Sequence, residues 1–141
     1  MNIREATTDV LDEAVRLEQT FPSKERWSEA AWAEELRNPS RVALVACAHE
    51  IAVGILLLAP GPDVTDLLRI IVADDARRLG VAERLLAAGF ERCPGRWLLE
   101  VREDNEPARN FYEKQGFCVI DRRRDYYGEG LDAIIYERKA D

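Results

Sequence analysis

The sequence predicts a mixed α/β fold in which helices flank a central β-sheet, and three observations support this. The chain has 141 residues, the length of one domain, and 47% of them are hydrophobic, so it can bury a core without disulfides or a structural metal. Strand-like apolar runs alternate with helical periodicity in the middle of the chain. Glycine and proline fall between these segments, as they do in turns. Because no repeat or linker interrupts the pattern, we expect a single domain over residues 1–141.

The first half of the chain is expected to hold two helices and four strands. Ser28 is a helix N-cap, and Asn38-Pro39 ends the helix that it starts. Two apolar runs separated by His49-Glu50 predict a hairpin. In chain order the elements are a strand over 2–7, helices over 9–20 and 29–37, and strands over 41–48, 51–59 and 64–72.

The second half alternates helices and strands. A turn over residues 74–80 leads into a helix with Leu85, Leu86 and Phe90 on one side, which Cys93-Pro94-Gly95 breaks. Another helix begins at Asp104-Asn105-Glu106-Pro107 and stops at Gly116. Strands are expected over 97–101, 119–124 and 133–139, which makes the order β α α β β β α β α β β.

Composition excludes several classes of protein. The 27 acidic residues outnumber the 20 basic ones, and a net charge of -7 disfavours a main role in nucleic-acid binding. The longest nearly uncharged stretch, residues 51–62, is too short to cross a bilayer, and residues 1–5 do not resemble a signal peptide, so a cytoplasmic protein with no membrane partner is expected. Three scattered cysteines and one histidine indicate neither a disulfide framework nor a metal site.

The first candidate site is the turn at residues 74–80. The first N–H groups of the helix that follows have no intrahelical acceptor, and a helix N-terminus of this kind attracts anions. Gly80 would let a phosphate approach the backbone. The spacing alone leaves two alternatives open: a phosphate site, or an ordinary helix-starting loop with solvated arginines.

The pattern Arg77-x-x-Gly80-x-Ala82 resembles the pyrophosphate-binding signature of the GCN5-related N-acetyltransferases, the GNAT superfamily. The resemblance implies a GNAT fold and acetyl coenzyme A (acetyl-CoA) as cosubstrate, with no metal. Leu79 departs from the basic or small residue that many members carry. The coenzyme-binding residues implied are Ile70, Ile71, Val72, Arg77, Arg78, Leu79, Gly80, Val81, Ala82 and Asn105.

A longer block, residues 99–117, resembles the bacterial ribosomal-protein alanine N-acetyltransferases of the RimI type. Two further stretches agree. Phe21-Pro22 and Trp27-Ser28-Glu29 are similar to a Phe-Pro-Trp-Ser-Glu segment near the peptide entrance, here interrupted by residues 23–26, and residues 123–135 are similar to the family's C-terminal motif. Trp27, Tyr126 and Tyr127 are thereby implied as substrate-binding residues.

Glu100 and Tyr112 are the candidate catalytic residues. Strand alternation places Glu100 on the face opposite Trp97, Leu99 and Val101, where it either faces solvent or is placed for use. Tyr112 could equally pack in the core, although the adjacent Phe111 is the better core candidate. The resemblance implies that Glu100 is the general base and Tyr112 the general acid, and that the Val72 N–H polarises the acetyl carbonyl. Asn105 can cap the following helix, contact the coenzyme, or do both.

We therefore expect an acyltransferase that acetylates the N-terminal α-amine of a protein, with a ribosomal small-subunit protein beginning with alanine as the preferred acceptor. Two alternatives stay open. The acceptor could be a small-molecule amine such as a polyamine, an amino acid or an antibiotic, or the chain could be a catalytically idle module that senses coenzyme A.

Overall fold

A computed structural model of the chain describes residues 1–140, while Asp141 and the side chains of Ser23, Arg77 and Arg78 lie outside the described part. The chain divides into two compact units. The first comprises Met1–Pro60 and Leu67–Cys93, and the second comprises Gly61–Asp66 and Pro94–Asp141. The expectation of a single domain over residues 1–141 stays a prediction.

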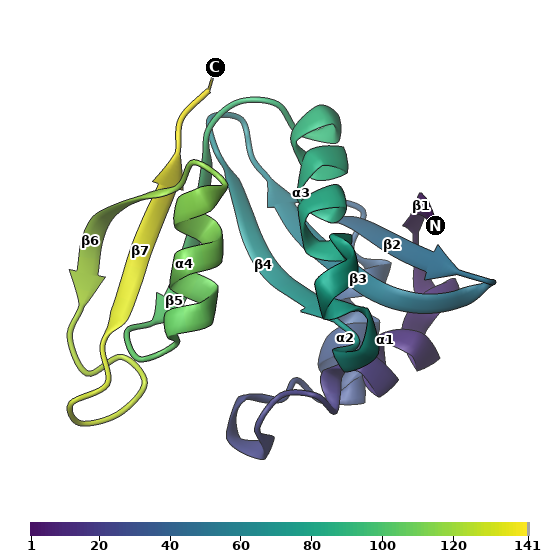
Figure 1. Ribbon diagram of the computed structural model, residues 1–141, viewed down its shortest axis with the longest axis horizontal. Coiled ribbons are helices and arrows are strands. Elements are labelled where there is room, and N and C mark those ends of the chain that lie inside the picture. Colours follow the sequence, from purple (N-terminus) through teal and green to yellow (C-terminus); the bar gives the residue numbers. More distant parts are fainter. Residues whose placement is uncertain (141) are drawn as a thin grey trace. The chain divides into compact units, whose positions relative to one another are not determined.

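The α/β class and the order of helices and strands are confirmed (Figure 1). The elements are β1 (Asn2–Ala6), α1 (Leu11–Glu18), α2 (Glu29–Arg37), β2 (Val42–Ala48), β3 (Ile51–Pro60), β4 (Thr65–Val72), α3 (Val81–Arg92), β5 (Trp97–Arg102), α4 (Glu106–Lys114), β6 (Cys118–Arg123) and β7 (Ala133–Arg138). Short 3-10 turns span Thr8–Val10, Ser23–Glu25 and Asp74–Leu79. The described strands are hydrogen-bonded in the order β1-β2-β3-β4-β5-β7-β6.

The first unit is built on β1, β2 and β3, which pair antiparallel. His49 and Glu50 join β2 to β3 with φ angles of 51° and 67°, the left-handed conformation that tight hairpin turns require. Leu67–Val72, the larger part of β4, also belongs to this unit. Along β2 and β3 successive side chains point to opposite faces, and both faces are covered by helices.

One face packs on α1 and α2, and the other packs on α3. The core under α1 and α2 includes Leu17, Trp32 and Val45, all at most 1% exposed. On the opposite face Gly54 lets α3 approach closely, because a Cβ there would lie 2.9 Å from Val81 Cγ1. The absence of a side chain at Gly54 therefore allows the start of α3 to lie directly against the sheet.

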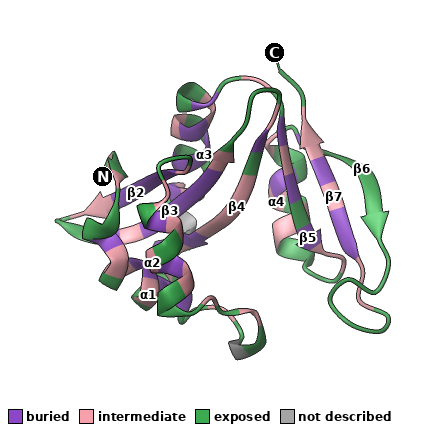
Figure 2. Cartoon of the chain, turned by 180° about the vertical axis from the view of Figure 1, so that it is seen from behind, coloured by how far each residue is buried: buried purple, intermediate pink, exposed green. Residues whose placement is uncertain are grey.

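The second unit contains β5, β7 and β6 as an antiparallel sheet with β7 in the middle. The start of β4 belongs to it as well, since Thr65 and Asp66 pair parallel with Trp97 and Leu98. Helix α4 contacts one face through Arg109 Nε, which donates to the Tyr136 hydroxyl at 3.0 Å. Every residue of β6 is exposed, and the strand is drawn green in Figure 2.

Candidate active site

The predicted anion site lies at the N-terminus of α3 in the first unit. Gly80 precedes the helix with a φ of 73°, a left-handed conformation that suits glycine. The Arg84 N–H donates to the Gly80 carbonyl at 3.1 Å, so the N–H groups of residues 81–83 precede the first intrahelical bond. The backbone therefore presents donors and the positive end of the helix dipole at the predicted place.

The side chains around the start of α3 do not all favour binding of an anion. The predicted side-chain roles of Arg77 and Arg78 lie outside the described residues. Leu79 is 70% exposed and so does not support the loop by packing. Glu83 approaches Gly80, since its Oε2 would lie 3.4 Å from a Cβ built there. A carboxylate thus lies at the site where the sequence predicts a pyrophosphate.

The other predicted coenzyme-binding residues of the first unit lie at the end of β4 and at the start of α3. Ile71 is 3% exposed in β4 and belongs to the core beneath α1 and α2, while Ile70 and Val72 are half-buried. Val81 is buried and Ala82 half-buried at the start of α3. Their predicted contacts with the coenzyme stay predictions.

Glu100 projects from β5 in the second unit on the face that the alternation predicts. Its neighbours Leu99 and Val101 are buried, whereas Glu100 is exposed. Arg123 Nη1 donates to Glu100 Oε1 at 2.9 Å, and the Arg123 Cζ lies 4.0 Å from the ring centroid of Tyr126. The bond to Glu100 raises the pKa of the Arg123 guanidinium. Glu100 is therefore accessible to a substrate and already carries a cationic partner.

The pairing of Arg123 with Glu100 is a feature that sequence reasoning missed. The two residues lie on β6 and β5, which flank β7, where Glu100 pairs with Ile135 and Arg123 with Ala133. The charged run of residues 122–124 was the available signal, but its partners follow from strand order and register.

Tyr112 lies on α4 and is 7% exposed. Its ring makes an edge contact with Phe117, at 5.7 Å between centroids, and lies 6.5 Å from Tyr136. Tyr136 pairs with Leu99, so this aromatic cluster lies on the face of β5 opposite Glu100. The prediction that Phe111 is the better core residue is wrong, because Phe111 is only half-buried and it is Tyr112 that fills the space between α4 and the sheet.

Two polar contacts fix α4 over this cluster. The Tyr136 hydroxyl donates to Glu113 Oε2 at 2.7 Å and accepts from Arg109 Nε. Burial raises the pKa of Tyr136, so it remains a neutral donor at physiological pH. At the start of the helix, Asn105 Oδ1 accepts from the Ala108 N–H at 3.2 Å, which confirms the predicted cap. Contact of Asn105 with the coenzyme stays a prediction.

The predicted substrate residues lie in connecting segments. Trp27 is half-buried and precedes α2 in the first unit. Its ring packs against Trp32, with 5.1 Å between the ring centroids. Tyr126 and Tyr127, in the β6–β7 connection of the second unit, are 49% and 37% exposed. Asp132 holds that connection by accepting from the Asp125 N–H and from Arg122, and these bonds lower its pKa. Because that pKa is lowered, the restraint is present at neutral pH and is lost as pH falls through it.

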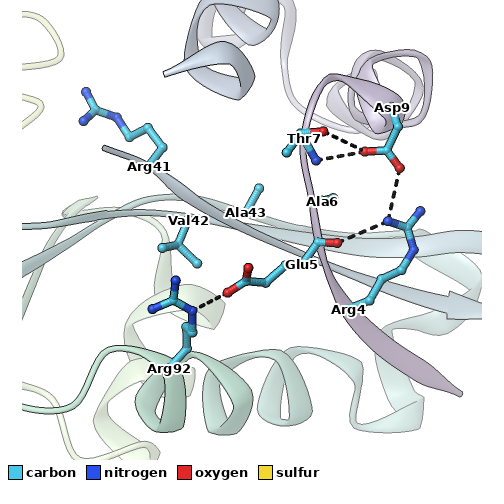
Figure 3. A pocket seen from close by; sticks show the side chains of 9 residues that line it. All are labelled: Arg4, Glu5, Ala6, Thr7, Asp9, Arg41, Val42, Ala43 and Arg92. Carbon is cyan, nitrogen blue, oxygen red and sulfur yellow. Dashed lines mark hydrogen bonds and ion pairs between the residues drawn. The ribbon is translucent and has the colours of Figure 1, made fainter. Parts of the chain in front are cut away.

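A pocket of about 370 Å³ lies elsewhere in the first unit (Figure 3). Its lining residues are Arg4, Glu5, Ala6, Thr7, Asp9, Arg41, Val42, Ala43 and Arg92. Arg4 pairs with Asp9, Arg92 with Glu5 and Arg41 with Glu35, so its guanidinium groups are neutralised by neighbours. It contains none of the predicted site residues.

Within residues 1–140, no group of three or more histidine, cysteine or acidic side chains is arranged so that it could hold a metal ion. Over the same residues, no helix combines the length and the apolar character needed to cross a membrane.

The chain is similar in part to curated acetyltransferases. It is 36% identical over 74 residues to an N-alpha-acetyltransferase of Sulfurisphaera tokodaii, a match covering 49% of this chain and 44% of the relative. It is 40% identical over 55 residues to the peptidyl-lysine N-acetyltransferase YiaC of Escherichia coli, covering 39% and 37%. The matched segments thus span less than half of these relatives' lengths.

Similarity to solved structures extends over the whole chain. The ribosomal-protein-S18-alanine N-acetyltransferase of Escherichia coli superposes with a TM-score of 0.89 at 25% identity, covering 99% of this chain and 93% of that one. An aminoglycoside 6'-N-acetyltransferase complexed with coenzyme A superposes with a TM-score of 0.87 at 20% identity, covering 99% and 97%, a likeness that shows the fold alone.

The model of the acetyltransferase (GNAT) family matches residues 7–117, a span that includes the loop before α3 as well as Glu100 and Tyr112. The predicted family is therefore confirmed, and the chain belongs to the GNAT acetyltransferases.

Proposed function

We propose that this protein transfers the acetyl group of acetyl-CoA to the N-terminal α-amine of a protein. The observation that carries the proposal is the likeness over 99% of the chain to the ribosomal-protein-S18-alanine N-acetyltransferase of Escherichia coli. The partial match to an N-alpha-acetyltransferase agrees with it. By analogy, a ribosomal small-subunit protein beginning with alanine is the preferred acceptor.

The backbone at the α3 N-terminus fits a coenzyme pyrophosphate, whereas the Glu83 carboxylate beside Gly80 opposes its charge. Gly80 has the left-handed conformation that keeps the approach to the backbone open, and the first N–H groups of α3 are available as donors. Acetyl-CoA would supply the acetyl group as a thioester. Val72 would donate its N–H to the acetyl carbonyl, and Asn105 would contact the coenzyme while capping α4.

Glu100 would take the proton of the acceptor amine, directly or through a water. A peptide α-amine has a pKa of about 8, so it is already partly neutral at pH 7 and needs only a modest base. The exposed position of Glu100 is compatible with this task. The neutral amine then attacks the thioester carbonyl, forming the amide C–N bond and breaking the C–S bond.

Tyr112 would donate its hydroxyl proton to the leaving thiolate. An ordinary phenol has a pKa of about 10 and stays protonated at neutral pH. The aromatic contacts of Tyr112 with Phe117 and Tyr136 would hold the ring in one orientation, which a positioned acid requires.

The acceptor peptide would contact Trp27, Tyr126 and Tyr127. Exposed tyrosines offer both apolar area and a hydroxyl, a combination that is common at recognition surfaces. The similarity to the peptide-entrance segment of the RimI type supports Trp27.

The deciding experiment is an acetylation assay with a panel of peptides that differ at residue one. Each peptide is made with a free and with a blocked α-amine, and one carries a lysine as its sole amine. We expect turnover of free α-amines, fastest with a small first residue such as alanine.

Three other results would each replace the proposal. Faster turnover of the lysine peptide would favour side-chain acetylation, the activity named for YiaC. Faster turnover of polyamines or aminoglycosides would favour a small-molecule acceptor. Coenzyme binding without thiol release from any amine would favour an idle sensing module.

A further inference from the structure

A buried carboxylate in the first unit has no role in the proposed chemistry. Glu18 ends α1, and its side chain has no exposed surface. Its Oε1 accepts from Trp32 Nε1 at 2.9 Å and from Arg69 Nε at 3.3 Å. Its Oε2 accepts from the Trp27 N–H at 3.1 Å and from Arg69 Nη2. The carboxylate is therefore satisfied by donors from three separate segments of the chain.

Arg69 extends this contact to the segment between α1 and α2. Its Nη2 also donates to the Glu25 carbonyl at 2.7 Å. Its Cζ lies 3.9 Å from the ring centroid of Phe21 and 5.0 Å from that of Trp27. A guanidinium is flat and can stack on aromatic rings while its edge bonds a carboxylate. Arg69 is thus in contact with both ends of the Phe21–Trp27 segment.

The four residues that interrupt the family's Phe-Pro-Trp pattern, 23–26, lie in sequence between Pro22 and Trp27. Residues 23–25 form a 3-10 turn, and Arg26 bonds back to the Phe21 carbonyl at 2.7 Å and the Gln19 carbonyl at 3.0 Å. The insertion therefore closes on itself and leaves Phe21 and Trp27 both in contact with Arg69.

We propose that Glu18 and Arg69 are positioning residues that hold Phe21 and Trp27 as a wall of the acceptor-peptide site, so that they determine the KM for the peptide. This rests on the proposed function, because Trp27 is placed at that site only there. A buried ion pair contributes little net stability but disfavours other arrangements of the residues that it joins. The Glu18–Arg69 pair would therefore act mainly by holding Phe21 and Trp27 in one arrangement, and less by adding to the stability of the fold.

The test compares Arg69→Lys with the unaltered enzyme. Lysine keeps the charge opposite Glu18 but cannot stack as a plane on Phe21 while bonding the Glu25 carbonyl. We expect the peptide KM to rise on the order of tenfold, with kcat and coenzyme affinity nearly unchanged, since a positioning residue away from the reacting atoms affects uniform binding.

Arg41→Lys is the matched control. Arg41 Nε bonds Glu35 Oε2 at 2.6 Å in a half-buried ion pair elsewhere in the first unit. Phe21→Leu serves as a second variant that removes one stacking ring and keeps both charges. The control should leave KM unchanged, and Phe21→Leu should raise it.

Tryptic cleavage after Lys24 and Arg26 gives a readout that needs no substrate. Cleavage of a folded protein reports how often a segment opens. We expect about tenfold faster cleavage at these sites in Arg69→Lys, measured by mass spectrometry against cleavage after Arg124.

The results separate the two proposals. Faster cleavage together with a raised KM supports the positioning role, whereas faster cleavage with an unchanged KM overturns it. Unchanged cleavage and KM in both variants overturn it as well. If the unaltered enzyme acetylates no peptide α-amine, the proposed function fails and the peptide wall with it, while the cleavage rates still report whether Arg69 holds the segment.

Discussion

Glu18 and Glu100 are two glutamates that each bond an arginine, and they differ in how far the carboxylate is exposed to solvent. Glu18 is enclosed and accepts from Trp27, Trp32 and Arg69. Glu100 is exposed on β5, and its partner Arg123 is exposed as well. A carboxylate with donors on both oxygens cannot take a proton without breaking bonds, whereas an accessible one can exchange its partner for a substrate. The difference separates a structural glutamate from a candidate base.

The largest expected effect is on stability. Glu18→Ala leaves Arg69 and the Trp32 N–H buried without their partner, so the free energy of unfolding should fall by about 3–5 kcal/mol. Glu100→Ala breaks an exposed pair and should change it by less than about 1 kcal/mol. Urea denaturation of both variants measures the contrast. Equal losses of unfolding free energy in the two variants would show that both glutamates contribute equally to stability.

Tyr112→Phe tests the acid and should leave the fold intact, because phenylalanine keeps the ring contacts with Phe117 and Tyr136. The acetylation rate should fall by about 10²-fold or more, with coenzyme affinity unchanged. Raising the pH should not restore the rate, since alkaline solvent is a poorer proton source. An unchanged acetylation rate in this variant would show that Tyr112 serves packing and not proton transfer.

Glu100→Gln tests the base through its pH dependence. At neutral pH the rate should fall because most of the acceptor amine remains protonated. As pH rises through about 8 the α-amine loses its proton unaided, and the rate should recover in part. A rate profile from pH 6 to 9, with coenzyme affinity as a check on folding, measures this. A deficit that persists at high pH would assign Glu100 a role other than proton removal.

A third glutamate sharpens the comparison with the smallest expected effect. Glu83 lies beside Gly80 at the α3 N-terminus, where a pyrophosphate is proposed to bind. Glu83→Gln removes a like charge, and coenzyme affinity should rise by a few-fold, the range of exposed charge pairs. Calorimetric titration with coenzyme A measures it. A lower affinity would show that Glu83 instead orders the loop.

Local signals were sufficient to predict the helices and strands and their order along the chain. Ser28 and Asn38 mark the ends of α2, which spans Glu29–Arg37 as predicted. Gly116, with a φ of 92°, follows α4 as predicted, and a hairpin forms at His49-Glu50. These signals act within a few residues of the structure that they specify, which is why one sequence reveals them.

The environment of the candidate site was less predictable. Glu100 was placed on the correct face, since alternation is a local property. Arg123 reaches it across β7, however, and Arg69 meets Glu18 from 51 positions away in sequence. Contacts of this kind depend on strand order and packing, which composition and spacing do not encode. The sequence did not predict that Tyr112 would be more deeply buried than Phe111. Adjacent residues on a helix point in different directions, and which of the two faces the sheet depends on how α4 packs.

The contacts of Arg69 and Arg26 also bear on engineering of the chain. They restrain Phe21, Glu25 and Trp27, while Lys24 at the tip of the turn is exposed. Lengthening a flexible loop costs only about 0.6 kcal/mol for each doubling of its length. A short epitope tag or a fluorophore-acceptor sequence placed between Ser23 and Lys24 should therefore leave the fold intact. Because the turn belongs to the proposed wall of the acceptor-peptide site, such an insertion would serve as a probe of peptide entry rather than as a neutral label.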